Sequence, residues 1–336
     1  MLGRITVVKS LLVPNITYIA SVSNIDRENV TKFKKLIFDF IWNKKHEKVA
    51  RTTLCSDYSR GCLKMFNIDK CIDAILINWV KRLTSKTETM CNWKVIPQFY
   101  FEKYGNNFLI FNMNIDNIKS LDKSIDNLPE FYVNILKTWI KSRKENTKPQ
   151  TFREIRQEII WGNKYIKFYG KSLIYNNWIN DNIIFINDIV DQKGCISQNH
   201  ILDKLSKKSN WFSEYSKLVK AIPQEWKNIL KEHQSTRTKV KVDYKITIKN
   251  NRNQKFEICS ITNKQIYQIL NENKFQDVIG FQKWRKVLNV ENYRHHLEDV
   301  LYFTFSFLTD NRFKIMKWKL LHYILPWKIV TSQDTK

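Results

Sequence analysis

Hydrophobic residues in the first part of the chain recur every three or four positions, which is the spacing of one face of an α-helix. Residues 26–42 carry one such stripe, and residues 67–83 repeat it more regularly, with Asn67 placed to cap their start. We therefore predict two amphipathic helices within a helical first 90 residues. The residues between them, 43–66, are basic and rich in turn formers and are predicted to be a connector.

The pattern changes in the middle of the chain. Between residues 159 and 197, β-branched and aromatic clusters are broken by glycine and asparagine, which indicates short strands and hairpins. Residues 211–232 return to the helical period, with an interruption at Pro223. Residues 240–248 then alternate apolar and polar positions, so we predict a strand there that turns back to pair with residues 255–260.

Helical spacing resumes over residues 262–325, where Asp310 is placed to cap the last helix. The predicted fold is mainly α, of the α+β type. It divides into four segments: an N-terminal helical bundle at 1–90, a helical connector and linker at 91–150, a mixed α/β insert with short strands and hairpins at 151–260, and C-terminal helices at 261–336.

The composition also indicates what kind of partner the protein binds. The chain has 336 residues, of which 43% are hydrophobic, as in folded proteins. Its 57 lysines and arginines face 32 acidic residues, a formal charge of +25 that attracts polyanions. Only seven glycines are present, which argues against Gly-rich phosphate-binding loops.

The N-terminal residues and the cysteines indicate the cellular compartment of the protein. Arg4 and Lys9 in residues 1–22 have the outline of a secretory signal, but Pro14 and Asn15 interrupt its apolar stretch. The six cysteines are scattered, which fits free thiols in a reducing compartment. We expect a nuclear or cytoplasmic protein that is not secreted and has no membrane partner.

No local signature of an active site is present. Two-metal phosphoryl chemistry needs clustered carboxylates, and the sequence has no adjacent Asp-Asp pair. Glu298 and Asp299 beside His295 and His296 are better explained as a polar helix start. Residues 170–172 (GKS) resemble the end of a phosphate-binding loop but are better explained as a hairpin turn. We predict no catalytic residue, no metal ligand and no cofactor.

Two segments concentrate the positive charge. Residues 30–51 contain seven basic and two acidic residues, and residues 231–256 contain eight and two. Lysine and arginine contacts to phosphate supply sequence-independent affinity, whereas the alternative is an ordinary solvated face. The overall excess of charge favours nucleic acid. The predicted nucleic-acid-binding residues are Lys32, Lys35, Lys44, Lys45, Lys48, Arg51, Lys239, Lys241 and Lys245.

Four blocks of the sequence match, in order, the motifs of one known family. They are residues 2–14 (LGRITVVKSLLVP), 38–45 (FDFIWNKK), 61–68 (GCLKMFNI) and 313–326 (FKIMKWKLLHYILP). Together they resemble the C-terminal part of LINE-type (non-LTR) retrotransposon reverse transcriptases. In that family the corresponding blocks are the segment after the polymerase palm, the F-x-W-x-x-K element, a G-G-L-x-(L/M)-P-(N/D) turn before a helix, and the helix before the zinc knuckle.

The resemblance implies that residues 1–90 form the thumb that grips template–primer duplex, followed by a connector and a wrist-like region that holds element RNA. Cys62 and Phe66 depart from the family's glycine and proline. The family's (F/Y)-A-D-D motif, with its catalytic aspartates, is absent, so no catalytic residue carries over. Mg²⁺ is implied only together with a catalytic palm.

The leading hypothesis is thus a non-catalytic fragment of an RNA-directed DNA polymerase. Its expected partners are RNA, RNA–DNA hybrid and the palm and endonuclease parts of the same polyprotein. The alternatives are a host-adopted helical module for protein interaction or RNA packaging, and an element remnant without function. Whether the chain alone is an enzyme stays open at this point.

Overall fold

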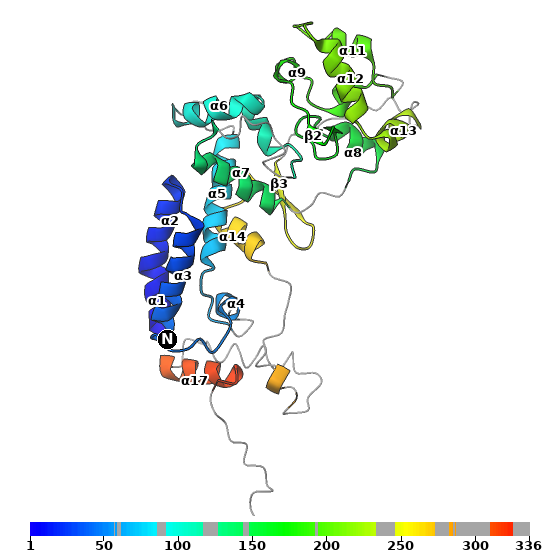
Figure 1. The fold of residues 1–336 in the computed structure, drawn as a ribbon. Helices are drawn as coiled ribbons and strands as arrows, with labels where there is room; N and C mark the ends of the chain where they lie inside the picture. The colour runs from blue at the N-terminus through cyan, green and yellow to red at the C-terminus, as the bar shows by residue number, and fades with distance from the viewer. Residues whose placement is uncertain are drawn as a thin grey trace, which may run out of the picture. The chain divides into compact units, whose positions relative to one another are not determined.

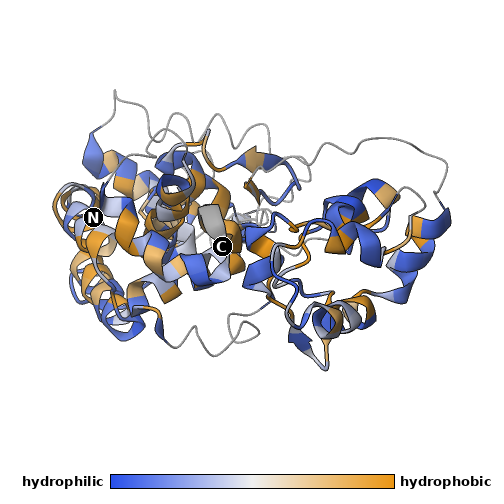
Figure 2. Cartoon of the chain, turned by 90° about the horizontal axis from the view of Figure 1, so that it is seen from above, coloured by the Kyte–Doolittle hydropathy of each residue, from blue (hydrophilic) through white to orange (hydrophobic). Residues whose placement is uncertain are grey.

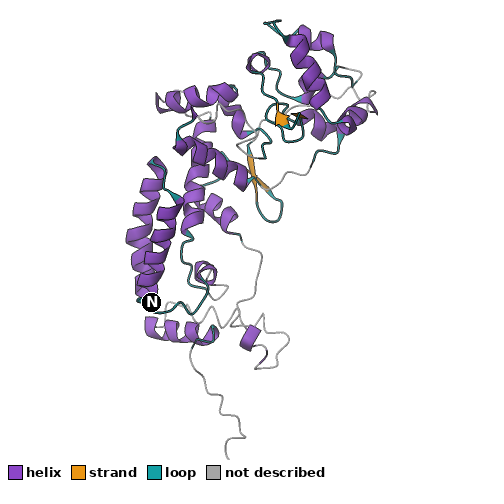
Figure 3. Cartoon of the chain, viewed as in Figure 1, coloured by secondary structure: helices purple, strands orange, loops and turns teal. Residues whose placement is uncertain are grey.

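The computed structural model describes residues 1–56, 58, 62–85, 92–116, 127–143, 148–191, 194–232, 246–272, 282–284, 286 and 310–324. These residues are mainly helical, and the strands among them form two separate antiparallel hairpins (Figure 3). The prediction of a mainly α fold of the α+β type is confirmed. The chain divides into two compact units, one made of Met1–Ile72 with Asn271–Lys336 and one made of Asp73–Leu270. The four predicted segment boundaries stay predictions.

The first unit begins with a long helix built from α1 (Leu2–Val7), a π-helical turn (Val8–Leu12) and α2 (Val13–Val22). This helix continues through Pro14, although proline in a regular α-helix clashes with the carbonyl four residues earlier. Here Val13 N–H donates to the carbonyl of Val8, five residues back, and this wider turn gives the proline ring room.

The helix Leu2–Val22 is, among the described residues, the one long and apolar enough to cross a membrane by length and composition. A buried core helix meets the same criteria. Five of its side chains are buried: Ile5, Val8, Val13, Ile16 and Ala20. The absence of a membrane partner stays a prediction.

Helices α3 (Arg27–Trp42), α4 (Arg51–Cys55) and α5 (Ile68–Thr84) follow (Figure 1). The two amphipathic helices expected from the hydrophobic spacing are therefore confirmed, with ends shifted by one residue. The predicted cap is also present, because Lys70 N–H donates to Asn67 Oδ1 at 3.4 Å.

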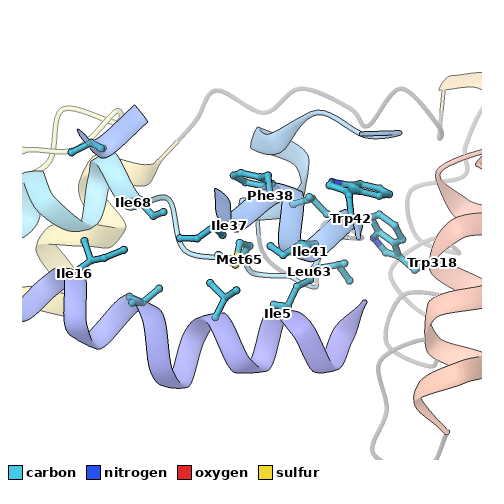
Figure 4. Packing of buried hydrophobic residues seen from close by; sticks show 14 residues of the cluster. Ile5, Ile16, Ile37, Phe38, Ile41, Trp42, Leu63, Met65, Ile68 and Trp318 are labelled. Atoms are coloured by element: carbon cyan, nitrogen blue, oxygen red, sulfur yellow. The ribbon is translucent and has the colours of Figure 1, made fainter. Parts of the chain in front are cut away.

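The core of the first unit joins residues from both ends of the chain. Side chains of α1–α3 and of the connector close around Met65 and Leu63, and Trp318 from α17 (Asn311–Leu321) completes the cluster beside Trp42 (Figure 4). Asp310 caps α17 as expected, since its Oδ1 accepts from Arg312 N–H at 3.2 Å.

The second unit contains short helices and both hairpins. Its elements after α5 are α6 (Val95–Phe101), three 3₁₀ turns (Asn92–Lys94, Glu102–Tyr104, Asn106–Phe111), α7 (Glu130–Ser142), α8 (Phe152–Gln157), β1 (Lys167–Phe168), β2 (Lys171–Ser172), α9 (Asn176–Asn180), α10 (Ile186–Ile189), α11 (Gln198–Leu202), α12 (Trp211–Ala221), α13 (Gln224–Glu232), β3 (Thr247–Lys249), β4 (Lys255–Glu257) and α14 (Asn263–Asn271).

The predicted breaks fall close to the observed ones. The helical stretch 211–232 divides at Pro223 into α12 and α13, and β3 pairs with β4 in the predicted antiparallel sense. Residues 240–245 of the predicted strand lie outside the described residues. Between 159 and 197 the structure contains one hairpin and two isolated β-bridges, and short helices occupy much of the remainder. The β content there is thus lower than expected from the β-branched residues, which instead point into the core.

Buried tryptophans hold the second unit together through their indole N–H groups. Trp139 donates to the Phe111 carbonyl at 2.8 Å, and Trp161 donates to the Ile183 carbonyl at 2.7 Å. A buried indole that keeps its hydrogen bond contributes its apolar area without leaving a polar group unsatisfied. Packing therefore accounts for these aromatic residues.

The cysteines within the described residues are all free thiols, as expected. Burial raises the pKa of both Cys55 and Cys71 to about 12. At pH 8 such a thiol is ionised to only about one part in 10⁴, against about one part in four for a free cysteine. Since the thiolate is the nucleophile, we expect Cys55 and Cys71 to react with iodoacetamide at least about 100-fold more slowly than exposed Cys259, measured by mass spectrometry.

Chain unfolded in urea provides the control for this labelling, because all three thiols are then expected to react at similar rates. The same pKa shifts determine how the stability of the fold changes at high pH. A thiol whose pKa is raised on folding loses a proton more easily in the unfolded chain, so stability should fall as the pH rises above about 8.5. If Cys55 and Cys71 are labelled as fast as Cys259 in the folded chain, the two thiols are not buried as described.

Candidate nucleic-acid interface

The predicted basic connector begins at a sharp reversal of the chain after α3. Asn43 and Lys44 both have φ of 57°, in the left-handed region. Their N–H groups donate to the carbonyls of Phe40 (3.2 Å) and Asp39 (2.7 Å), which ends the helix with its last carbonyls satisfied. The backbone therefore places two consecutive lysines, Lys44 and Lys45, at the exposed end of α3.

Four of the predicted lysines on α3 and in the connector lack a side-chain partner among the described residues: Lys35, Lys44, Lys45 and Lys48. All four are exposed to solvent. By contrast, Lys32 forms an exposed ion pair with Glu28 at 2.8 Å, one helical turn away. Such a pair contributes about 0.3–0.5 kcal/mol, so Lys32 can exchange Glu28 for another anion at little cost.

Arg51 is held more firmly than the lysines. Its Nε donates to both carboxylate oxygens of Glu47 at 3.0 and 3.1 Å, and its guanidinium lies 4.6 Å from the ring centroid of Phe38. The hydrogen bonds that Arg51 donates to Glu47 raise the pKa of Arg51. Arg51 thus connects α4 to α3, and it reaches a phosphate only by sharing or leaving Glu47. Its predicted role in binding stays a prediction.

Other basic residues of the first unit serve the fold. Arg4 donates to the Phe40 carbonyl at 3.1 Å, and Lys9 donates to the Leu63 carbonyl at 3.3 Å. Burial, and then the neighbouring Lys64, lower the pKa of Lys9. The candidate interface is accordingly the set Lys35, Lys44, Lys45 and Lys48, which we call the connector lysines.

The second predicted basic segment is described only at its end. Lys239, Lys241 and Lys245 lie outside the described residues. Within the adjoining hairpin, Lys249 and Lys255 stand directly opposite each other on β3 and β4. Burial and then Lys255 lower the pKa of Lys249. Like charges at paired positions of a hairpin destabilise it, and an anion bound between them removes that cost.

Glu158 and Arg143, both half-buried, have the perturbed pKa values that can mark an active site. Burial raises the pKa of Glu158 and lowers that of Arg143 to about 10. Glu158 accepts from Asn163 Nδ2 at 2.9 Å, while Arg143 donates to the carbonyls of Phe111 (3.3 Å) and Met113 (2.6 Å). These bonds satisfy main-chain and side-chain groups of the fold, so we assign the pair a structural role.

No three His, Cys, Asp or Glu side chains of the described residues lie close enough together to hold a metal ion. The cluster at 295–299 lies outside those residues. Residues 170–172 belong to a hairpin, as predicted, with Gly170 in the two-residue turn and Lys171 and Ser172 forming β2.

No protein-family model matches this sequence, and neither does any curated protein sequence. Its function is therefore argued from its own residues.

Proposed function

We propose that this chain is a non-catalytic nucleic-acid-binding protein, related to the C-terminal part of a LINE-type reverse transcriptase, that grips template–primer duplex and element RNA. The observation that carries the proposal is the group of connector lysines, which are exposed and lack side-chain partners among the described residues. A formal charge of +25 across the chain acts in the same direction.

The local geometry favours an external anion as the partner of these lysines. A helix C-terminus attracts cations, but the last carbonyls of α3 already accept from the N–H groups of Asn43, Lys44 and Lys45. The ammonium groups are therefore left for solvent or a ligand. Phosphates along a nucleic-acid backbone can bind several of them at once and release condensed counterions, which supplies affinity that falls steeply with salt.

Catalysis is not part of the proposal. The aspartate pair of the related polymerases has no counterpart in this sequence, and Mg²⁺ would enter only with a catalytic palm from elsewhere in the same polyprotein. We expect no incorporation of deoxynucleotides by the pure chain. Incorporation that depends on this chain contradicts the proposal.

The test is binding across a salt series. The purified chain is titrated with an RNA–DNA template–primer, a structured RNA and a random duplex DNA, each between 50 and 300 mM salt. Since each phosphate contact to duplex contributes about 0.9 to the slope of log K against log salt, four connector lysines predict a slope of about −3.6. A steep slope with tighter binding of the hybrid or the structured RNA supports the proposal. Weak binding of all three at every salt contradicts it.

A second candidate, a helical protein-interaction module, has one observation in its favour. The first unit exposes large apolar side chains on α1–α3, among them Leu11, Tyr18 and Leu36, at 61%, 71% and 64% exposure. Figure 2 shows hydrophobic residues alternating with polar ones along the helices. Exposed apolar patches commonly mark protein contacts. Light scattering distinguishes this candidate, since concentration-dependent association without nucleic-acid binding favours it over the leading proposal.

A further inference from the structure

The tip of the β1–β2 hairpin carries an exposed tyrosine where a small polar residue is expected. Only Tyr169 and Gly170 connect the two strands, which pair Phe168 with Lys171 and Lys167 with Ser172. Both tip residues have positive φ, 48° and 77°. This is the pattern of a type I′ turn, which favours Asn-Gly or Asp-Gly because those residues enter the left-handed region most easily.

Tyrosine at the first position strains the turn, and the one ring contact of Tyr169 among the described residues is with its neighbour Phe168. A bulky side chain is uncommon in the left-handed region because its Cβ crowds the backbone there. Burial does not offset this strain, since Tyr169 is 91% exposed. Its ring makes a T-shaped contact with that of its neighbour Phe168, with centroids 4.5 Å apart. At 91% exposure the phenol ring still remains largely available to a flat ligand.

The surroundings of the tip are positively charged. Lys164, Lys167 and Lys171 lie between residues 159 and 180, a stretch without a single acidic residue. Lys171 is exposed and has no side-chain partner among the described residues, whereas Lys164 and Lys167 both pair with Asp116, at 3.9 and 3.3 Å. Helix α12 packs beside β1 and adds the exposed Lys217 and Lys220.

We propose that Tyr169 stacks on an unpaired nucleobase while Lys167 and Lys171 of the same hairpin bind the adjoining phosphates. This inference rests on the proposed nucleic-acid-binding function. It adds to that function a second contact site, in the second unit, which binds single-stranded RNA or DNA. A short turn fixes the ring at the end of a hairpin, so little conformational freedom is lost when it stacks. Stacking on an aromatic ring tolerates any base, because every base has a π-face. The exposed ring at the strained tip is therefore suited to stack against a base.

The experiment separates the ring from the turn. In Tyr169→Asn the turn receives its preferred residue and loses the ring, so we expect unchanged or higher thermal stability together with weaker binding. Binding is measured with single-stranded RNA and single-stranded DNA of about 12 nucleotides and with a blunt DNA duplex. The expected loss is at least about fivefold for both single strands, and at most about twofold for the duplex, whose bases are stacked inside.

Two further variants serve as controls. Tyr169→Phe keeps the ring and should bind single strands within about twofold of the parent chain. Phe212→Ala removes a ring of the same unit that is 60% exposed, and it should leave binding unchanged. If the parent chain binds single strands and Tyr169→Asn binds them equally well, the stacking inference is wrong while the proposed function stands. Equal losses for single strands and duplex also overturn it. If the parent chain binds no nucleic acid, both proposals fail.

Discussion

The combined substitution Lys44→Gln, Lys45→Gln and Lys48→Gln is expected to weaken binding to an RNA–DNA template–primer by at least about 100-fold at 0.1 M salt. The three ammonium groups are exposed and lack side-chain partners among the described residues, so each is available for one phosphate. Losing three contacts should reduce the slope of log K against log salt by about 2.7. The fold should be unaffected, because none of these side chains is buried.

The matched control removes the same charge from elsewhere on the surface. Lys103, Lys207 and Lys208 are exposed and also lack side-chain partners among the described residues. Changing them together to glutamine lowers the net charge by the same amount. If this control variant loses as much affinity as the connector variant, attraction is generic to the +25 chain and the connector is not an interface. Thermal unfolding of both variants checks that neither loss comes from misfolding.

Replacement of Trp318 by alanine is expected to destabilise the first unit by about 3–5 kcal/mol. The side chain is fully buried in the cluster that includes Trp42, Ile41 and Leu63. Removal of so large a side chain loses its transfer free energy and leaves a cavity. For a unit of this size the midpoint of thermal unfolding should fall by about 10 °C, measured by calorimetry.

Phe313→Ala is the control for Trp318→Ala, since Phe313 lies on the same helix and is 57% exposed. We expect it to cost less than about 1 kcal/mol. Equal effects of the two substitutions would mean that α17 does not contribute to the core through Trp318. The transition of the second unit should be unchanged in both variants.

Local features of the fold were predictable because their causes lie within a few residues. The helical stripe of residues 67–83, the caps at Asn67 and Asp310 and the break at Pro223 each depend on neighbouring positions. A hairpin turn was also predicted at residues 170–172, and the structure places the turn one residue earlier, at Tyr169 and Gly170. Gly170 was the local signal, since it enters the left-handed region easily, whereas Tyr169 gave none.

Features that depend on distant contacts were not predictable in the same way. Nothing in the spacing of residues 313–326 indicates that Trp318 packs with Trp42, since that contact joins the two ends of the chain. The first helix continues through Pro14 because of the π turn, and no local sequence pattern indicates such a turn.

The residues predicted for the candidate interface differ in whether their charged groups are available to bind phosphate. Charge counting treats Arg51 and Lys48 alike, yet only Arg51 binds Glu47 and covers Phe38. The spacing of Glu47 and Arg51, four residues apart, was the signal that could have separated them.

The joining of both chain ends in one core also has a consequence for synthesis. Trp42 leaves the ribosome long before Trp318, and at about 5–20 residues per second the delay is on the order of 10–60 s. During that time the Asp73–Leu270 unit can complete its fold, whereas the first helices still lack part of their core. Nascent chains should therefore pass through a stage in which the N-terminal helices depend on chaperones, and polysome-bound intermediates should be protected from protease in the second unit first.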